Sequence, residues 1–215
     1  GSSESGPNVP MLKKKQNDVV NRSPEEQKIL ASCGFPHNGV HVRIVNESNE
    51  DVEPGVIGEI IVKSKGVLKE WWQKPEESLE TIVDGWVHTG DMGYYDERGY
   101  IYVADRKKDM IVSGGENIFP REVEEVLYHH PTIQEAAVIG IPDPYWVESV
   151  HAVVVLKEGM SISGEELIKF CKQRLARYKS PKTVEFASSL PKTPSGKILK
   201  REIREKYWRD RERKL

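Results

Sequence analysis

Lys197 is the residue of this chain best placed to do chemistry. It lies in a loop that Pro191 and Pro194 stiffen, and the neighbouring Gly196 lets the backbone come close to a ligand. An ammonium group held there is a point charge that can face an anionic reacting group. A nucleotide P-loop is excluded, because Pro191 and Ile198 stand where that motif needs a glycine and a serine or threonine. The alternative is an ordinary surface lysine after a turn.

Two further segments contain candidate binding residues. Asp91 follows Thr89 and Gly90, a pattern that predicts a tight turn with a short hydrogen-bond acceptor on it. Gly114 and Gly115 follow Ser113 and permit close approach of the backbone to a ligand. The alternatives are a carboxylate that caps its own turn and a hairpin whose turn needs positive φ.

The first half of the chain must position Asp91, and it reads as a turn-rich β unit. Residues 41–48 alternate apolar and polar, and residues 58–64 form a short apolar run. A short helix is predicted to begin near Pro75, followed by short β segments separated by turns at 84–85, 90–91 and 96–99. We expect a small β subdomain with the form of a distorted barrel.

The second half must position Lys197, and there strands and helices alternate. Pro120 is typical of a first helical position, and Ser163 with Glu166 forms a capping-box pattern. Apolar strands are predicted between and after these helices, and a last helix over residues 199–211. We therefore expect an α+β fold of two domains, with the boundary within residues 106–109: residues 1–107 form the β subdomain and residues 108–215 a compact α+β domain.

Composition limits the classes of partner. The chain has 215 residues, 32 Lys and Arg against 34 Asp and Glu, and a net charge of −2, which gives no general argument for nucleic acid or membrane binding. No apolar run reaches the ~20 residues of a membrane-spanning helix. The two cysteines lack metal-site spacing and indicate a reduced, cytoplasmic protein. The basic segment after Leu190 could bind a polyanion, and the alternative is a C-terminal helix whose charges face solvent. The start without methionine suggests a cut end.

Taken together, the motifs resemble a known family. They are, in order along the chain, Ser3-Glu4-Ser5-Gly6-Pro7, Gly85-Trp86, His88-Thr89-Gly90-Asp91, Asp105-Arg106-Lys107-Lys108-Asp109, the run SGGENIFPREVEEVL and Pro194-Ser195-Gly196-Lys197. This set resembles the C-terminal part of the AMP-forming acyl-CoA synthetases, in the adenylate-forming superfamily that also holds beetle luciferases and peptide-synthetase adenylation domains.

The resemblance implies a two-step reaction. A carboxylic acid attacks the α-phosphate of Mg-ATP to give an acyl-adenylate and pyrophosphate, and the thiol of coenzyme A then displaces AMP. The small C-terminal domain acts as a mobile lid that rotates between the two steps. The acid itself is not defined, although a medium or long fatty acid is favoured by general similarity.

The resemblance assigns five residues to adenylation. Lys197 would contact the acyl carboxylate and the phosphate, where negative charge develops in the transition state. Asp91 and Arg106 would bind the ribose hydroxyls of ATP and AMP, the alternative for Arg106 being a surface ion pair. Ser3 would contact phosphate, and Glu4 would help to hold Mg²⁺, which prefers oxygen ligands.

Three residues are assigned to the second step. Lys108 stands at the hinge of the family, where a residue must absorb a large φ/ψ change; the alternative is one more charge in a basic turn. Gly114 and Gly115 would line the tunnel for the pantetheine arm of coenzyme A.

The sequence also allows other functions. The phosphate-binding loop, the adenine platform and most of the acyl pocket belong to an N-terminal region that these 215 residues lack, so we expect the isolated chain to be inactive, as a truncated or split piece. It would then need that region as a partner, and a homodimer is possible. The alternatives are a non-catalytic binding module, or an adenylating enzyme that uses a carrier protein or oxygen in place of coenzyme A.

Overall fold

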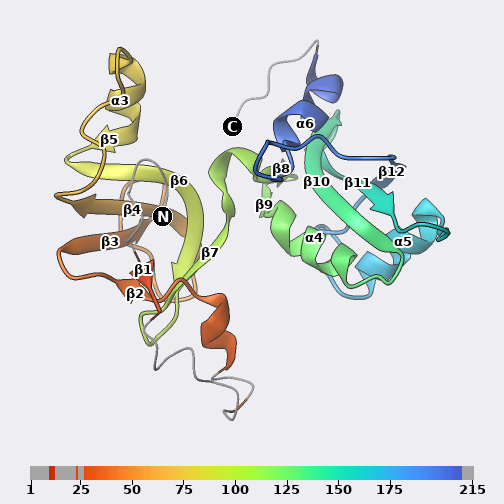
Figure 1. The fold of residues 1–215 in the computed structure, drawn as a ribbon, viewed down its shortest axis with the longest axis horizontal. Helices are drawn as coiled ribbons and strands as arrows, with labels where there is room; N and C mark the ends of the chain where they lie inside the picture. Colours follow the sequence, from red (N-terminus) through yellow and green to blue (C-terminus); the bar gives the residue numbers. More distant parts are fainter. Residues whose placement is uncertain (1–9, 13–22, 24–26, 210–215) are drawn as a thin grey trace. The chain divides into compact units, whose positions relative to one another are not determined.

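The protein is described here by a computed structural model, which covers residues 10–12, 23 and 27–209. It divides into two compact units, Gly1–Lys107 and Lys108–Leu215. Each unit has its own sheet (Figure 1).

Unit 1 is built on a curled, five-stranded antiparallel sheet that forms a half-barrel. The strand order is β3-β4-β6-β5, and β7 also pairs with β6. β5 pairs with the start of β6 and β7 with its end, so both share one edge of this long strand. The strands are β3 (Val40–Val45), β4 (Gly58–Ser64), β5 (Ile82–Val83), β6 (Trp86–Tyr95) and β7 (Ile101–Arg106), and the smaller elements are β1 (Pro10–Met11), η1 (Lys28–Ala31), β2 (Phe35–Pro36) and α3 (Pro75–Thr81).

The turn predicted at Gly90 and Asp91 is wrong. β6 runs through this point as one strand, and the residues form a bulge in its pairing with β4. Gly90 has φ +68°, a conformation that favours glycine. The hydroxyl of Thr89 fixes the bulge, because it donates to the carbonyl of Ile60 at 2.6 Å and accepts from the backbone N–H of Asp91 at 3.1 Å.

Unit 2 is an α+β sandwich around a second five-stranded sheet. β10 and β11 form its long hairpin, β8 and β12 both pair with β11, and only β12 runs parallel to its neighbour. Its elements are η2 (Lys107–Asp109, which begins at the end of unit 1), β8 (Ile111–Ser113), β9 (Glu116–Ile118), α4 (Pro120–Tyr128), β10 (Ile133–Asp143), β11 (Val147–Leu156), α5 (Gly164–Lys172), β12 (Thr183–Phe186) and α6 (Lys200–Trp208).

The helices of unit 2 cover both faces of its sheet. On one face α4 and α5 bury Val123, Leu127 and Leu167 against the sheet, and on the other α6 buries Ile203. The predicted helix starts are confirmed: Pro120 is the first residue of α4, and Ser163 and Glu166 form both hydrogen bonds of the capping box before α5.

The α+β fold class is therefore confirmed. None of the helices in the described part of the chain is long and apolar enough to cross a membrane.

Candidate functional site

The loop that carries Lys197 is a small closed turn. The backbone N–H of Thr193 donates to the carbonyl of Lys197 at 2.8 Å, and the N–H of Lys197 donates back to the hydroxyl of Thr193 at 3.1 Å. Gly196 has φ +85°, and its N–H donates to the carbonyl of Thr193 at 2.9 Å. Lys192 and Ile198 form an antiparallel bridge at the base of the loop. These bonds hold the backbone of Lys197 in place and leave its side chain exposed.

The ammonium group of Lys197 differs from the other cations nearby. Within the described residues it has no acidic partner. On α6, in contrast, Lys200 lies 2.8 Å from Glu124 and Lys206 lies 2.5 Å from Glu185. Among the described residues of the basic end, several cations of α6 thus lie in ion pairs, whereas Lys197 is exposed on a hydrogen-bonded loop.

Asp91 and Arg106 are brought together by strand pairing. They are direct partners in the register of β6 and β7, and Arg106 Nε lies 2.7 Å from Asp91 Oδ1. The side chain of Arg106 is half-exposed and that of Asp91 is one-quarter exposed. The surface ion pair that the sequence left open for Arg106 is thus present, and it joins the two residues predicted to bind ribose. Together they present a carboxylate acceptor and a guanidinium donor at one point of unit 1.

Glu59 is a buried carboxylate behind this site that sequence reasoning missed. It accepts from the backbone N–H of Gly90 at 3.2 Å, and its side chain lies 2.9 Å from Lys107 Nζ and 3.3 Å from His88 Nδ1. Burial alone raises the pKa of the carboxyl, but the hydrogen bonds and charges of Lys107 and His88 outweigh it, so the pKa lies below its ordinary value. The only signal in the sequence is a charge inside an apolar strand.

Gly114 and Gly115 form the turn of the β8–β9 hairpin. Their φ angles are +62° and +84°, so the structure contains the hairpin that the sequence offered as an alternative. Trp146 packs on Gly114: a Cβ atom added there would lie 2.7 Å from Cε3 of the indole, whereas one at Gly115 would meet nothing within 4 Å. The indole thus lies directly over one of the two candidate residues, and the hairpin reading does not exclude a ligand.

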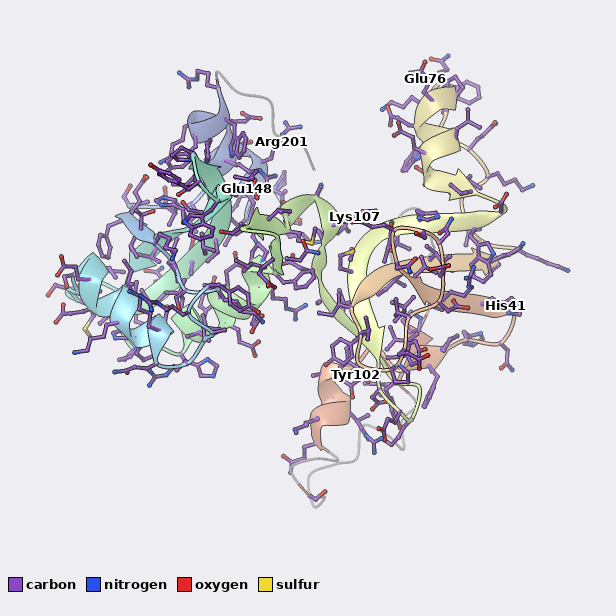
Figure 2. All side chains as sticks on the ribbon, turned by 180° about the vertical axis from the view of Figure 1, so that it is seen from behind. His41, Glu76, Tyr102, Lys107, Glu148 and Arg201 are labelled. Atoms are coloured by element: carbon purple, nitrogen blue, oxygen red, sulfur yellow. The ribbon has the colours of Figure 1, made fainter. Side chains whose placement is uncertain are left out.

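Lys108 lies at the boundary of the two units. It is exposed and sits in the middle of the single 3-10 turn η2. Short 3-10 segments are typical connectors. Lys107, labelled in Figure 2, is the last residue of unit 1.

The two remaining predicted residues, Ser3 and Glu4, lie outside the described residues. Among the residues that are described, no group of three or more His, Cys, Asp or Glu side chains is arranged to hold a metal ion.

The sequence of the chain was compared with those of known proteins. Residues 122–197 match the model of the AMP-binding enzyme C-terminal domain. A fatty acid–[acyl-carrier-protein] ligase of Streptomyces coeruleorubidus is 43% identical over 87% of this chain and 36% of its own length, and a long-chain-fatty-acid–CoA ligase of Bacillus subtilis is 53% identical over 81% of this chain and 31% of its own length. The chain thus spans about a third of these relatives.

The fold agrees with the sequence comparison. The solved structure of O-succinylbenzoate coenzyme A synthetase from Bacillus subtilis in complex with AMP superimposes with a TM-score of 0.81 at 34% identity, covering 100% of this chain and 41% of that one. We conclude that residues 122–197 form an AMP-binding enzyme C-terminal domain and that the chain as a whole corresponds to the C-terminal part of the adenylate-forming enzymes it resembles.

Proposed function

We propose that this chain supplies the ribose-binding edge and the mobile lid of an acid–CoA ligase. In the first reaction a carboxylate oxygen of the acid bonds to the α-phosphorus of ATP, and the bond to the β-phosphate oxygen breaks to release pyrophosphate. In the second, the sulfur of coenzyme A bonds to the acyl carbon, the thiol proton is lost and AMP leaves. The observation that carries the proposal is the exposed ammonium of Lys197 on a hydrogen-bonded loop of the matched domain.

Lys197 would act in the first reaction. As the new P–O bond forms, negative charge accumulates on the phosphate oxygens, and a positioned ammonium stabilises that state more than the ground state. The Thr193 hydrogen bonds support this role, because they fix the lysine backbone before the substrate arrives. Mg²⁺ would supply further charge neutralisation, with Glu4 as its ligand.

Asp91 and Arg106 would hold the ribose. A diol presents two hydroxyl donors, which a carboxylate can accept, and the guanidinium can donate to a ribose oxygen. The bulge at Gly90 supports this assignment, because it fixes the backbone of Asp91 through Thr89 rather than leaving it on a free loop.

Rotation about Lys108 would exchange the faces that unit 2 presents to the substrate. In the second orientation the Gly114-Gly115 turn would lie along the pantetheine arm, where the absence of side chains allows close approach of the thiol. The exposed position of Lys108 between two compact units supports the hinge assignment.

Coenzyme A is the acceptor we propose, and a carrier-protein phosphopantetheine is the second candidate. The relative from Streptomyces coeruleorubidus, whose name specifies an acyl-carrier protein, favours the carrier-protein phosphopantetheine. For the acid we propose a fatty acid, since both relatives are named for fatty acids.

The test uses two forms of the protein. One is the 215-residue chain, and the other is the completed ligase, meaning this chain preceded by the region that its relatives carry. Each is mixed with Mg-ATP, coenzyme A or a phosphopantetheinylated carrier protein, and a panel of fatty and aromatic acids. We expect pyrophosphate and AMP from the completed ligase and none from the chain alone. A completed ligase that releases neither product with any acid would contradict the proposal and favour a binding module.

A further inference from the structure

The boundary between the units is flanked by an ion pair on each side, and each pair lies within one unit. On the unit 1 side, Lys107 Nζ is 2.9 Å from Glu59 Oε2. The side chain of Glu59 is only 10% exposed, and it also accepts from the backbone of β6 at Gly90. Lys107, at the end of unit 1, is therefore tied to the centre of its own sheet.

On the unit 2 side, Arg204 holds the first two residues of the unit. Both terminal nitrogens of its guanidinium lie 3.3 Å from Asp109 Oδ1, and one of them also donates to the carbonyl of Lys108 at 3.4 Å. The side chains of Arg204 and Asp109 are 12% and 15% exposed, so water screens this pair weakly. Arg204 belongs to α6, which is anchored to the sheet by buried Ile203 and by the indole of Trp208, whose N–H donates to the carbonyl of Gly140 at 3.0 Å.

We infer that Glu59 and Arg204 are positioning residues that confine the swivel of the chain to the backbone of Lys108. Neither touches substrate in this assignment. The effect of these residues on catalysis rests on the proposed function, whereas their restraint on the hinge does not. Lys107 is tied to β4, whereas the carbonyl of Lys108 and the side chain of Asp109 are both tied to α6. The torsions that lie between these two anchors are φ and ψ of Lys108.

Arg204 also connects the hinge to the reactive loop. α6 begins at Lys200, directly after the closed turn of Lys197. Because Arg204 fixes α6 to Asp109, rotation about Lys108 moves the Lys197 loop and the hinge end as one body. A pivot of one residue returns the ammonium to the same point after each turnover, whereas a slack linker would spread it over many positions and lower its effective concentration at the reacting atoms.

The chain offers a matched control on the same helix. Arg201 is 82% exposed and forms only a solvent-exposed ion pair with Glu205 at 3.3 Å. In Figure 2 its side chain extends away from α6. Removing its charge changes the net charge as much as removing that of Arg204, but it leaves Asp109 untouched.

The structural part is tested on the 215-residue chain by limited trypsin digestion, with fragments identified by mass. Trypsin needs a locally opened backbone, so the cleavage rate after Lys107 and Lys108 reports how often the hinge opens. Because residue 109 directly follows one cleaved bond, each rate is divided by that of an unstructured peptide with the same sequence. We expect Arg204→Gln and Asp109→Asn each to raise this corrected rate roughly tenfold, Glu59→Gln to raise it after Lys107, and Arg201→Gln to leave it unchanged. Because Asp109→Asn is nearly isosteric, it keeps the test valid if Arg204→Gln fails to fold. Unchanged cleavage in Asp109→Asn would overturn the inference.

The functional part is tested in the completed ligase by single-turnover adenylation. We expect Arg204→Gln to slow acyl-adenylate formation roughly tenfold with the KM for ATP unchanged, and the Arg204→Gln/Asp109→Asn double variant to be no slower than either single one. If Arg204→Gln increases trypsin cleavage but does not slow acyl-adenylate formation, the pair of Arg204 and Asp109 has a purely structural role and the inference is overturned. If instead Lys197→Ala leaves adenylation intact while the cleavage result holds, the proposed function fails and the hinge geometry stands.

Discussion

Asp91 and Arg106 face each other across β6 and β7, with the Arg106 Nε 2.7 Å from the Asp91 Oδ1. The bulge at Gly90 places Asp91 in this position, and Glu59 supports the bulge from behind through the Gly90 N–H. A carboxylate and a guanidinium held by strand register are better fixed than a pair on two loops. This arrangement leads to the first prediction.

Asp91→Ala is expected to abolish selection for the ribose hydroxyls. In the completed ligase, the unaltered protein should use ATP far better than 2′,3′-dideoxy-ATP, because a site built to accept hydrogen bonds from hydroxyls rejects an analogue that lacks them. The Asp91→Ala variant should use both nucleotides equally poorly. The ratio of kcat/KM for the two nucleotides measures this, with Glu97→Ala, which removes an exposed carboxylate of the same unit, as the control. Undiminished discrimination in Asp91→Ala would show that the ribose is bound elsewhere.

Sequence alone predicted the elements whose signals are local. Pro120 and Ser163 mark helix starts by the chemistry of helix ends, and both helices begin there. The sequence did not indicate that Gly90 and Asp91 form a bulge, because a Thr-Gly-Asp run has the same local appearance in a turn and in a strand whose partner is distant in the chain.

The same limit explains the missed site residues. Glu59 matters because of Gly90 and Lys107, and Arg204 because of Asp109, and these contacts depend on tertiary packing. No spacing rule within β4 or α6 marks either residue. Conversely, the prolines and the glycine around Lys197 are a local signal of a constrained loop, and the structure contains that loop, whereas the role of the lysine is taken from the resemblance to the family.

Gly114→Ala is expected to impair thioester formation more than Gly115→Ala. Both substitutions place alanine at a positive φ, at a cost of about 1–2 kcal/mol each. Only the Cβ at position 114 would lie 2.7 Å from Trp146 and displace the indole. The rate of thiol attack on preformed acyl-adenylate measures the difference. Gly159→Ala, which also has positive φ and no neighbour within 4 Å, is the control. If all three variants slow thiol attack equally, backbone strain alone explains the loss and the contact with Trp146 does not contribute.

The stability of unit 2 is expected to rise as the pH rises towards about 6.5, the ordinary pKa of histidine. Burial of His151 lowers the pKa of its imidazole below 6.5, although Glu185 acts in the opposite direction and Lys206 in the same one. His151 Nε2 also lies 2.8 Å from the hydroxyl of Tyr207, and Nδ1 lies 2.7 Å from that of Thr183. His151 binds a proton more readily in the unfolded chain than in the folded unit. The free energy of unfolding is therefore largest above about pH 6.5 and decreases as the pH falls from there towards the lower folded-state pKa.

Urea unfolding at several pH values, followed by the indole NMR signal of Trp208, measures this dependence. His151→Gln should flatten it, because glutamine retains hydrogen bonding without titrating. His41→Gln, at an exposed position of unit 1, should not (Figure 2). An unchanged slope in His151→Gln would assign the pH dependence to other groups.

Lys108→Pro is expected to block the alternation of the lid. Proline fixes φ near −65° and removes the N–H, so the hinge can no longer adopt a second conformation that needs another φ. Thioester formation in the completed ligase should fall by at least roughly tenfold while acyl-adenylate still forms, and Lys108→Ala should retain most of the activity. Normal thioester formation by Lys108→Pro would place the swivel at another residue.

The most direct test of the central claim separates the two half-reactions in Lys197→Ala. Loss of one charge-stabilising contact in the transition state typically costs ~10²–10³ in rate, or about 3–4 kcal/mol. Lys182→Ala, which removes an exposed lysine of the same unit, serves as the control. The account predicts that Lys197→Ala slows acyl-adenylate formation by that factor and leaves thiol attack on preformed acyl-adenylate nearly unchanged. Equal slowing of both half-reactions, or of neither, would contradict it.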